Sequence, residues 1–415
     1  MARLPHDRVP HDHVPHDHGS VPFASGRLPD GLRRVLACVV GALVLATMVG
    51  MVLLWPPPTV RDRRAGLGTP VELVDGTVTA APVVPCQSAL PGVALTCRDV
   101  SVRLTSGPEK GQSTALDITE GPDQPTLRDG DRIVLGRSDD GLAVAYYFAD
   151  YQRRAPLLAL GLLFALAVVG LARWRGLAAL IGLAVSLLVL VRFVLPAILA
   201  GSSPLPVALV GSSLIAIVII YLAHGVSART TTALLGTLGA LALTAVLAVV
   251  FVEVTRLTGL ASEEGTYLRG VLGSRVNLQG LLLGGIVIGA LGVLNDVSIT
   301  QASAVWEIHR ANPAVGARTL YASAMRIGRD HIASTVDTLV LAYAGAALPL
   351  FVVFTVADRR LGELITGEVV AEEVVQTLVG SLGLVAAVPI TTALACVLVT
   401  RLVPRPGAVG LDDAG

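Results

Sequence analysis

The sequence predicts a polytopic α-helical membrane protein of about eight transmembrane helices, with a small extracytoplasmic β domain between helices one and two. The composition is the first reason: 53% of the 415 residues are hydrophobic and only 15% are charged, whereas soluble domains carry about 25% charged residues. The second reason is that apolar runs recur along the chain, and a membrane-spanning helix needs about 20 such residues. The third is that residues 56–155 lack these runs.

Five segments are expected along the chain. They are a disordered His-rich cytoplasmic tail (1–32), an N-terminal membrane anchor helix (33–55), an extracytoplasmic β-rich domain (56–155), a seven-helix membrane bundle (156–400) and a cytoplasmic tail (401–415). The net charge is zero, so the balance of charges indicates no strongly basic or acidic partner, and no nucleic acid is expected as a partner.

The N-terminal tail contains Pro-His-Asp three times at a five-residue period. Proline at this spacing prevents a stable helix. His-rich tracts can bind zinc, nickel or copper, but a repeat-expanded tail without a role explains the pattern as well. The histidines concerned are His6, His11, His13, His16 and His18. No other cofactor is predicted.

The first apolar run, residues 35–54, resembles a signal peptide because it lies near the N-terminus. It is longer than a typical signal core, and the chain leaves it through WPPP rather than through a small-residue cleavage site. We therefore expect an uncleaved anchor.

The segment 56–155 has the pattern of an antiparallel β domain, of which an OB-like barrel is one possible form. Its short β-type runs, VELVDGTVTA, VALTCRDVSVRL, TALDITE, DRIVLGR and LAVAYYFAD, are separated by glycine, proline and aspartate. Cys86 and Cys97 flank a Pro-Gly turn signal in this domain. A disulfide between them would be allowed outside the membrane, and two free thiols are the alternative.

Eight apolar runs are candidate membrane spans. They cover residues 35–54, 157–172, 177–198, 206–223, 232–252, 281–299, 333–355 and 375–399. Arginines are more frequent in the segments before the first span, between alternate later spans and after the last span. Because cytoplasmic loops carry an excess of arginine and lysine, we expect both termini in the cytoplasm and the protein in the plasma membrane.

Two carboxylates, Asp296 and Asp337, fall inside the sixth and seventh spans. Ionisable residues at membrane depth are costly, which makes them functional candidates. On one helix Asp296 begins a polar stripe at steps of three and four residues through Thr300, Ser303, Glu307 and Arg310. Arg326, Asp330, Ser334 and Asp337 form a second stripe with the same steps. If the stripes face each other, they form a polar cleft that is open to the cytoplasm.

The predicted cleft also includes polar residues beside the two stripes. The full candidate set is Asp296, Asp337, Asn295, Thr300, Ser303, Glu307, Arg326, Arg329, Asp330, Ser334 and His224. The alternative is that these residues only form hydrogen bonds between helices near a hydrated boundary, and that His224 is a polar helix terminus before Gly225. On the outer side, Arg192 and Glu253 are either an ion pair or two side chains that extend to the interface.

Small residues indicate where helices pack closely. Gly285 and Gly289 form a GxxxG pattern in the sixth span, and Gly236, Ala240 and Thr244 recur every four residues in the fifth. Such rows allow close backbone approach, so we expect the sixth span inside the bundle.

Three stretches of this sequence resemble the conserved blocks of the YibE/F-like family of bacterial multi-pass membrane proteins. They are YLAHGVSARTTTALLGTLGA, LGVLNDVSITQASAVWEI and MRIGRDHIASTVDTLVLAYAGAALPL, and the resemblance covers roughly residues 156–400. It implies an integral membrane protein but no substrate. The residues that it marks as characteristic are Asp296, His224, Gly225, Gly328, Arg329, Asp330, Thr338 and Tyr343. Asp337 departs from the family pattern, where Asn or another polar residue is expected.

Two functions follow as hypotheses. The first is a permease or secondary transporter of an ion or small solute, with the lipid bilayer and that solute as partners. The second is a membrane scaffold or sensor whose outer domain binds a ligand or a partner protein; a homo-oligomer or a membrane-protein partner fits either. An enzyme is not expected, because Walker A, HExxH and GxSxG motifs are absent from the sequence.

Overall fold

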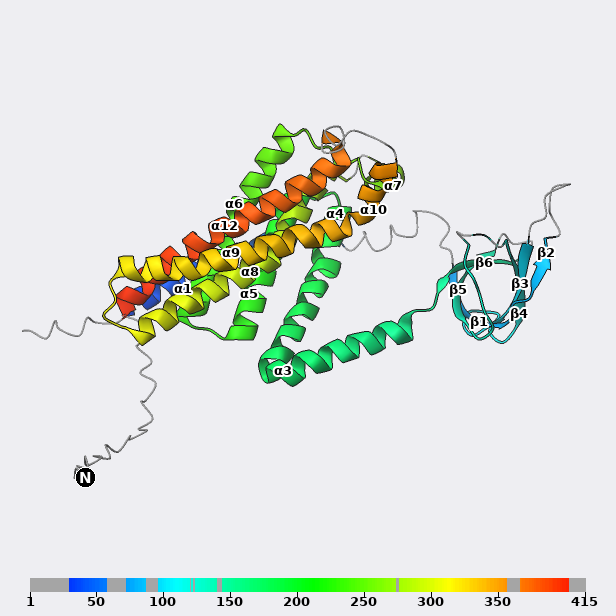
Figure 1. The fold of residues 1–415 in the computed structure, drawn as a ribbon, viewed down its shortest axis with the longest axis horizontal. Coiled ribbons are helices and arrows are strands. Elements are labelled where there is room, and N and C mark those ends of the chain that lie inside the picture. The colour runs from blue at the N-terminus through cyan, green and yellow to red at the C-terminus, as the bar shows by residue number, and fades with distance from the viewer. Residues whose placement is uncertain are drawn as a thin grey trace, which may run out of the picture.

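The protein consists of a helical bundle and a small β domain that lie apart and are joined through helix α3 (Figure 1). This computed structural model describes residues 30–57, 72–86, 96–119, 121, 124–139, 144–273, 276–356 and 366–402. The histidines of the proposed metal-binding tail lie outside the described residues.

The β domain is a curled, six-stranded antiparallel sheet (Figure 1). Its strands are β1 (Glu72–Ala80), β2 (Val83–Pro85), β3 (Thr96–Leu104), β4 (Ser113–Thr119), β5 (Arg132–Asp139) and β6 (Val144–Tyr151). The strand order is β2-β3-β1-β5-β6, and β4 pairs with the other edge of β3. Each of the five predicted β-type runs forms a strand, and the short β2 is an addition.

Alternating residues of these strands build a core of their own. Its buried members are Val74, Val78, Val100, Val102, Leu104, Leu116, Leu127, Ile133 and Leu135. Near the end of β5, Arg137 donates hydrogen bonds to Glu109 and Glu72, with its Nη2 2.9 Å from Oε1 of Glu109. This bond, followed by the one from Tyr146, lowers the pKa of the Glu109 carboxyl. The ion pair between Arg137 and Glu109 is therefore fully formed at neutral pH, and it is lost only as the pH falls through the lowered pKa of Glu109.

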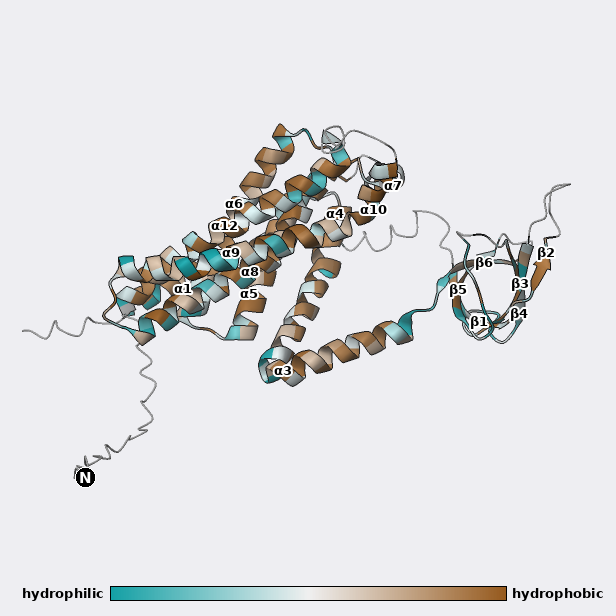
Figure 2. Ribbon diagram, viewed as in Figure 1, coloured by the Kyte–Doolittle hydropathy of each residue, from teal (hydrophilic) through white to brown (hydrophobic). Residues whose placement is uncertain are grey.

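The remaining elements are helical. They are α1 (Asp30–Leu53), α3 (Arg154–Val189), the π-helical turn η2 (Leu190–Val194), α4 (Leu195–Leu199), α5 (Pro204–His224), α6 (Ala228–Val254), α7 (Glu263–Leu272), α8 (Leu278–Ala311), α9 (Ala317–Ala346), α10 (Leu348–Val356) and α12 (Glu368–Leu402). Figure 2 shows hydrophobic residues along most of these helices. This arrangement is compatible with a multi-pass membrane protein.

Among the described residues, six helices are long and apolar enough to cross a membrane. They are Asp30–Leu53, Arg154–Leu199, Pro204–His224, Ala228–Val254, Leu278–Ala311 and Glu368–Arg401. The predicted number of eight is therefore not confirmed. The count of six takes Arg154–Leu199 as one element, although it breaks at Arg173 between the predicted spans 157–172 and 177–198. It also leaves out span 333–355, which lies in α9 and α10, of which α9 carries several charged residues.

Helix α3 breaks at Arg173, where φ is 51° and ψ is −128°. A β carbon at Gly176 would lie 2.5 Å from the carbonyl oxygen of Val168, so only glycine allows the chain to fold this closely after the break. The first half of α3 leaves the bundle toward the β domain (Figure 1) and exposes Leu158, Leu163 and Leu171 on all sides. A helix that is apolar all round is typical of a surface facing lipid.

The centre of the bundle is formed by α6, α8 and α12, which pack against one another. Gly236 and Gly383 mark the closest approaches between α6 and α12: a β carbon at Gly236 would lie 2.1 Å from Oγ1 of Thr391, and one at Gly383 would lie 2.0 Å from Oγ1 of Thr244. Each helix thus offers a glycine where the other presents a threonine. Because α6 and α12 are antiparallel, this glycine–threonine contact occurs twice along their interface, once with the glycine on each helix.

Gly236→Ala is expected to lower the free energy of unfolding by about 1–3 kcal/mol, because the new methyl group overlaps a buried threonine that cannot rotate away freely. Gly239→Ala is the matched control, since Gly239 lies one turn away on the exposed face and its β carbon would meet Ile390 at 3.7 Å. The thermal unfolding midpoint of each variant, purified in detergent, measures the change in stability. Equal midpoints for the two variants would contradict this packing.

The glycines of α8 pack differently from the prediction. Gly285 faces open space, whereas β carbons at Gly280 and Gly284 would approach Pro204 and Ala208 of α5 within 2.9 and 3.3 Å. The face of α8 that contacts α5 thus contains Gly284 and not the predicted Gly285. One residue corresponds to a rotation of about 100° around the helix axis, so the two glycines lie on different faces.

Candidate functional site

Asp296 lies within α8, which continues without a break from Leu278 to Ala311. Across the gap to α9, the Nε2 atom of His331 lies 4.0 Å from Oδ2 of Asp296. This distance is too long for a direct hydrogen bond, but it allows a bridging water. The Asp296 side chain is 70% exposed and that of His331 is 34% exposed, so the pair opens at the surface of the helix bundle.

Two polar atoms at this pair have no protein partner among the described residues. The Nε2 atom of His331 is buried and makes no hydrogen bond, and the same holds for Oδ1 of the neighbouring Asn295. Unpaired polar atoms are costly in an apolar environment. The site therefore has unused hydrogen-bonding capacity for water, a proton carrier or a polar solute.

A second histidine, His224, lies within electrostatic reach of Asp296. His224 ends α5, and the charges of Arg229, Arg175 and Asp296 all act on it. Arg229 begins α6 and Arg175 follows the break in α3. Segments that are remote in sequence thus meet near His224. A capping box between Ser227 and Thr230 fixes the start of α6 there.

The structure places His331, and not Asp337, opposite Asp296. In an antiparallel helix pair, residues at similar sequence distance from the connecting loop lie side by side, and Asp296 and His331 satisfy this condition around the loop 312–316. Asp337 lies six residues further along α9. It is thus about 9 Å deeper and about 240° around the helix from His331. The expected pairing of two carboxylates is therefore not formed.

The two polar stripes lie on outward surfaces and do not enclose a cleft between α8 and α9. Most of their members are exposed, as are the flanking residues: Asp296, Thr300, Glu307, Arg310, Arg326, Arg329, Asp330, Ser334 and Asp337. Two of the contacts in the first stripe run along α8: Ser303 donates to the carbonyl oxygen of Ile299, and Arg310 lies 3.4 Å from Glu307.

The buried contact between these helices depends instead on Gln301. Its Nε2 atom donates to the carbonyl oxygen of Ala324 on α9 and to Oγ1 of Thr392 on α12, both at 2.8 Å. One turn away, Thr391 contacts Ser298 at 3.3 Å. A β carbon at Gly328 would lie 2.5 Å from Val388, so α9 meets α12 at close range here. Gln301 ties three helices together directly behind the Asp296 face.

Sequence reasoning missed His331 and Gln301. Counting residues outward from the loop 312–316 places His331 at the level of Asp296, but it does not tell which face of α9 turns toward α8. Ser298 and Gln301 stand three residues apart on the inner face of α8, and this spacing is the signal that marks them as partners for another helix.

The other predicted sites are distributed over the chain. Arg192 in η2 and Glu253 in α6 are both exposed, and no ion pair joins them in the described structure, so the predicted outer ion pair is not formed. In the β domain a disulfide joins Cys86 to Cys97. The described residues contain no group of three side chains suited to hold a metal ion.

Comparison with known proteins gives one result. A family model described as YibE/F-like protein matches residues 160–401, which is more than half of the chain. The match covers the bundle from α3 to the end of α12, including Asp296, His331 and Gln301. No curated protein and no solved structure gave a significant match.

Proposed function

This chain belongs to the YibE/F-like protein family, and we propose that it is a permease or secondary transporter in which Asp296 and His331 carry a proton during the transport of an ion or small solute. The observation that supports this most strongly is the pair itself. On two bundle helices Oδ2 of Asp296 and Nε2 of His331 lie 4.0 Å apart, and this imidazole nitrogen has no hydrogen-bond partner among the described residues. Both groups exchange protons, and carboxylate–histidine relays are typical of membrane transporters.

The proposal includes an orientation in the plasma membrane with both termini in the cytoplasm. Arg175 and Arg229 lie near His224, at the end of α5. Arg310 and Arg318 flank the connection between α8 and α9, which lies further out on the same side of the bundle (Figure 1). A concentration of arginine at one end is the pattern of a cytoplasmic surface. Asp296 and His331 would then be reached from the cytoplasm.

A second candidate function, a membrane sensor or scaffold, is favoured by the β domain. This domain has a separate hydrophobic core and a disulfide, and it stands clear of the bundle. Neither feature is needed for transport through the bundle.

Replacing residues 56–155 with a flexible linker distinguishes the two functions. If the protein is a transporter, proteoliposomes with the shortened protein should retain most of the proton flux that a potassium diffusion potential drives in the full-length protein. A pH-sensitive dye inside the vesicles reports that flux. If full-length protein and protein-free vesicles show the same flux, the transport proposal fails and the sensor function is favoured.

A further inference from the structure

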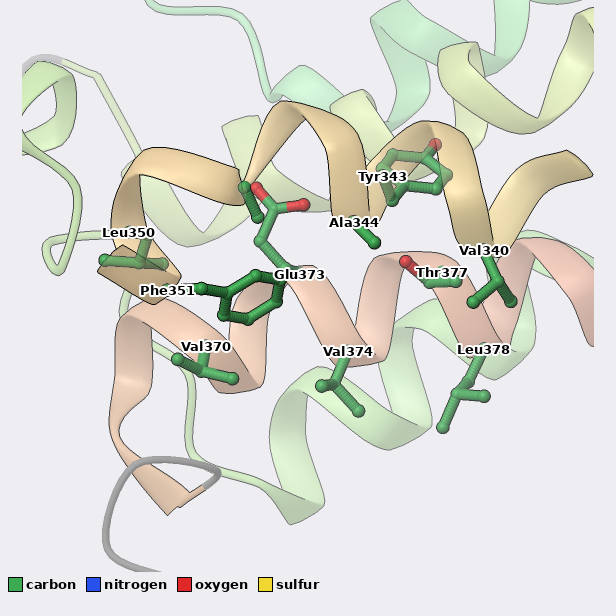
Figure 3. A pocket seen from close by; sticks show the side chains of 11 residues that line it. Val340, Tyr343, Ala344, Leu350, Phe351, Val370, Glu373, Val374, Thr377 and Leu378 are labelled. Atoms are coloured by element: carbon green, nitrogen blue, oxygen red, sulfur yellow. The ribbon is translucent and has the colours of Figure 1, made fainter. Parts of the chain in front are cut away.

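A separate pocket lies between α12 and the junction of α9 with α10, about 24 Å along α9 from His331 at 1.5 Å per residue. It has a volume of about 240 Å³. Figure 3 shows Glu373 of α12 rising toward the junction, with Phe351 and Val370 on one side and Val340 and Leu378 on the other. From this site we propose that the protein binds a small organic monocation with an aromatic or short alkyl body.

The lining explains the apolar part of this ligand. Eight of the eleven lining residues are aliphatic or phenylalanine: Val340, Ala344, Ala347, Leu350, Phe351, Val370, Val374 and Leu378. A ligand that fills this space must therefore be largely hydrophobic. The pocket is somewhat smaller than the range of about 300–1,000 Å³ that holds drug-sized ligands, so the ligand is small.

The charge of the ligand follows from Glu373. Among the described residues it is the only charged one in the lining, and no hydrogen bond or ion pair joins its carboxylate to any of the others. The two polar neighbours differ from it: Tyr343 already accepts a hydrogen bond from Gln376 at 3.3 Å, and Thr377 is buried. An unpaired carboxylate beside apolar walls favours a cation that is itself weakly hydrated.

The surroundings add to this preference. Glu368 and Glu372 precede Glu373 on α12, and the charges of Glu368 and Glu373 act on Glu372. These three glutamates in the first two turns of α12 concentrate cations near the pocket. The ring of Phe351 offers a face for a quaternary ammonium group through a cation–π contact. The carboxylate of Glu373, the neighbouring glutamates and the aromatic ring all favour the same ligand class.

Binding of benzyltrimethylammonium to the full-length protein in nanodiscs tests this site by titration calorimetry. Glu373→Gln should weaken binding roughly tenfold or more, because the charged contact is lost. Glu307→Gln, an exposed carboxylate at the other end of the bundle, should leave the affinity unchanged. Val374→Trp, which fills the pocket, should also abolish binding while the thermal unfolding midpoint confirms that the variant is folded.

The uncharged carbon analogue neopentylbenzene separates this proposal from simple lipid occupancy. It should compete poorly with the cation in the wild-type protein. If it competes equally well, or if Glu373→Gln binds the cation with unchanged affinity, the pocket is an apolar slot for lipid chains and the proposal is overturned. The proposal about Asp296 and His331 is tested by proton flux in proteoliposomes. A negative result in the cation-binding experiment therefore does not affect it.

Discussion

Replacing Asp296 with Asn is expected to reduce proton-coupled flux in proteoliposomes to the level of protein-free vesicles. Asn keeps the size and the polarity of the side chain but has no proton to give up, so the relay with the imidazole of His331 is broken. The side chain is 70% exposed and makes no hydrogen bond among the described residues, so the fold should tolerate the change. Flux is followed with a pH-sensitive dye after a potassium diffusion potential is imposed.

The control for this variant is Glu307→Gln on the same helix. Glu307 is exposed on the same polar stripe, and its contact is with Arg310 one turn away. Its loss should leave flux near the wild-type rate. Wild-type flux in the Asp296→Asn variant, with normal expression and unfolding temperature, would refute a role for this carboxylate in transport.

Cys97→Ser is expected to destabilise the β domain by about 3 kcal/mol, the value for closing a loop of this length. The disulfide joins residues eleven apart and ties the end of β2 to the start of β3. Domains of this size have only about 5–15 kcal/mol of stability, so the loss is a large part of the total. Pulse proteolysis of the full-length protein in increasing urea should show the β domain cleaved at lower concentration.

Cys38→Ser provides the comparison, because Cys38 is an exposed free cysteine of α1. It should leave the urea midpoint of the β domain unchanged. If Cys97→Ser has the same urea midpoint as wild-type protein in which the Cys86–Cys97 bond is shown to be formed, the disulfide does not stabilise the domain.

The strands and most helices follow from local pattern. Each apolar run longer than a membrane thickness lies in a helix, and each alternating run in residues 72–151 forms a strand. Burial of a continuous apolar run and burial of alternate residues are both determined by the geometry of one element. The break at Arg173 lies in the four residues that separate the predicted spans 157–172 and 177–198, so its position follows from the interrupted apolar run. The positive φ of this non-glycine residue does not follow from the pattern.

The candidate site could be predicted only in part from the local sequence pattern. Asp296 stands out because placing a carboxylate in an apolar helix costs free energy, whatever its neighbours are. Its partner could not be predicted, because helix-face spacing on α9 selects Asp330 and Asp337 and says nothing about which face turns toward α8. Packing of Ala324 and Gly328 against Gln301 and α12 decides that rotation, and His331 then comes to face Asp296.

The sequence by itself thus determined the membrane class, the β domain, the family and the presence of a carboxylate inside α8. These properties depend on composition and on periodicity within one segment. Only the tertiary structure decided that His331 is the partner of Asp296, that Gln301 joins three helices, that Gly284 and not Gly285 meets α5, and that Glu373 faces an apolar pocket. The physical reason is that rotation of a helix about its axis costs nothing in the isolated segment and is set only by close contacts between helices.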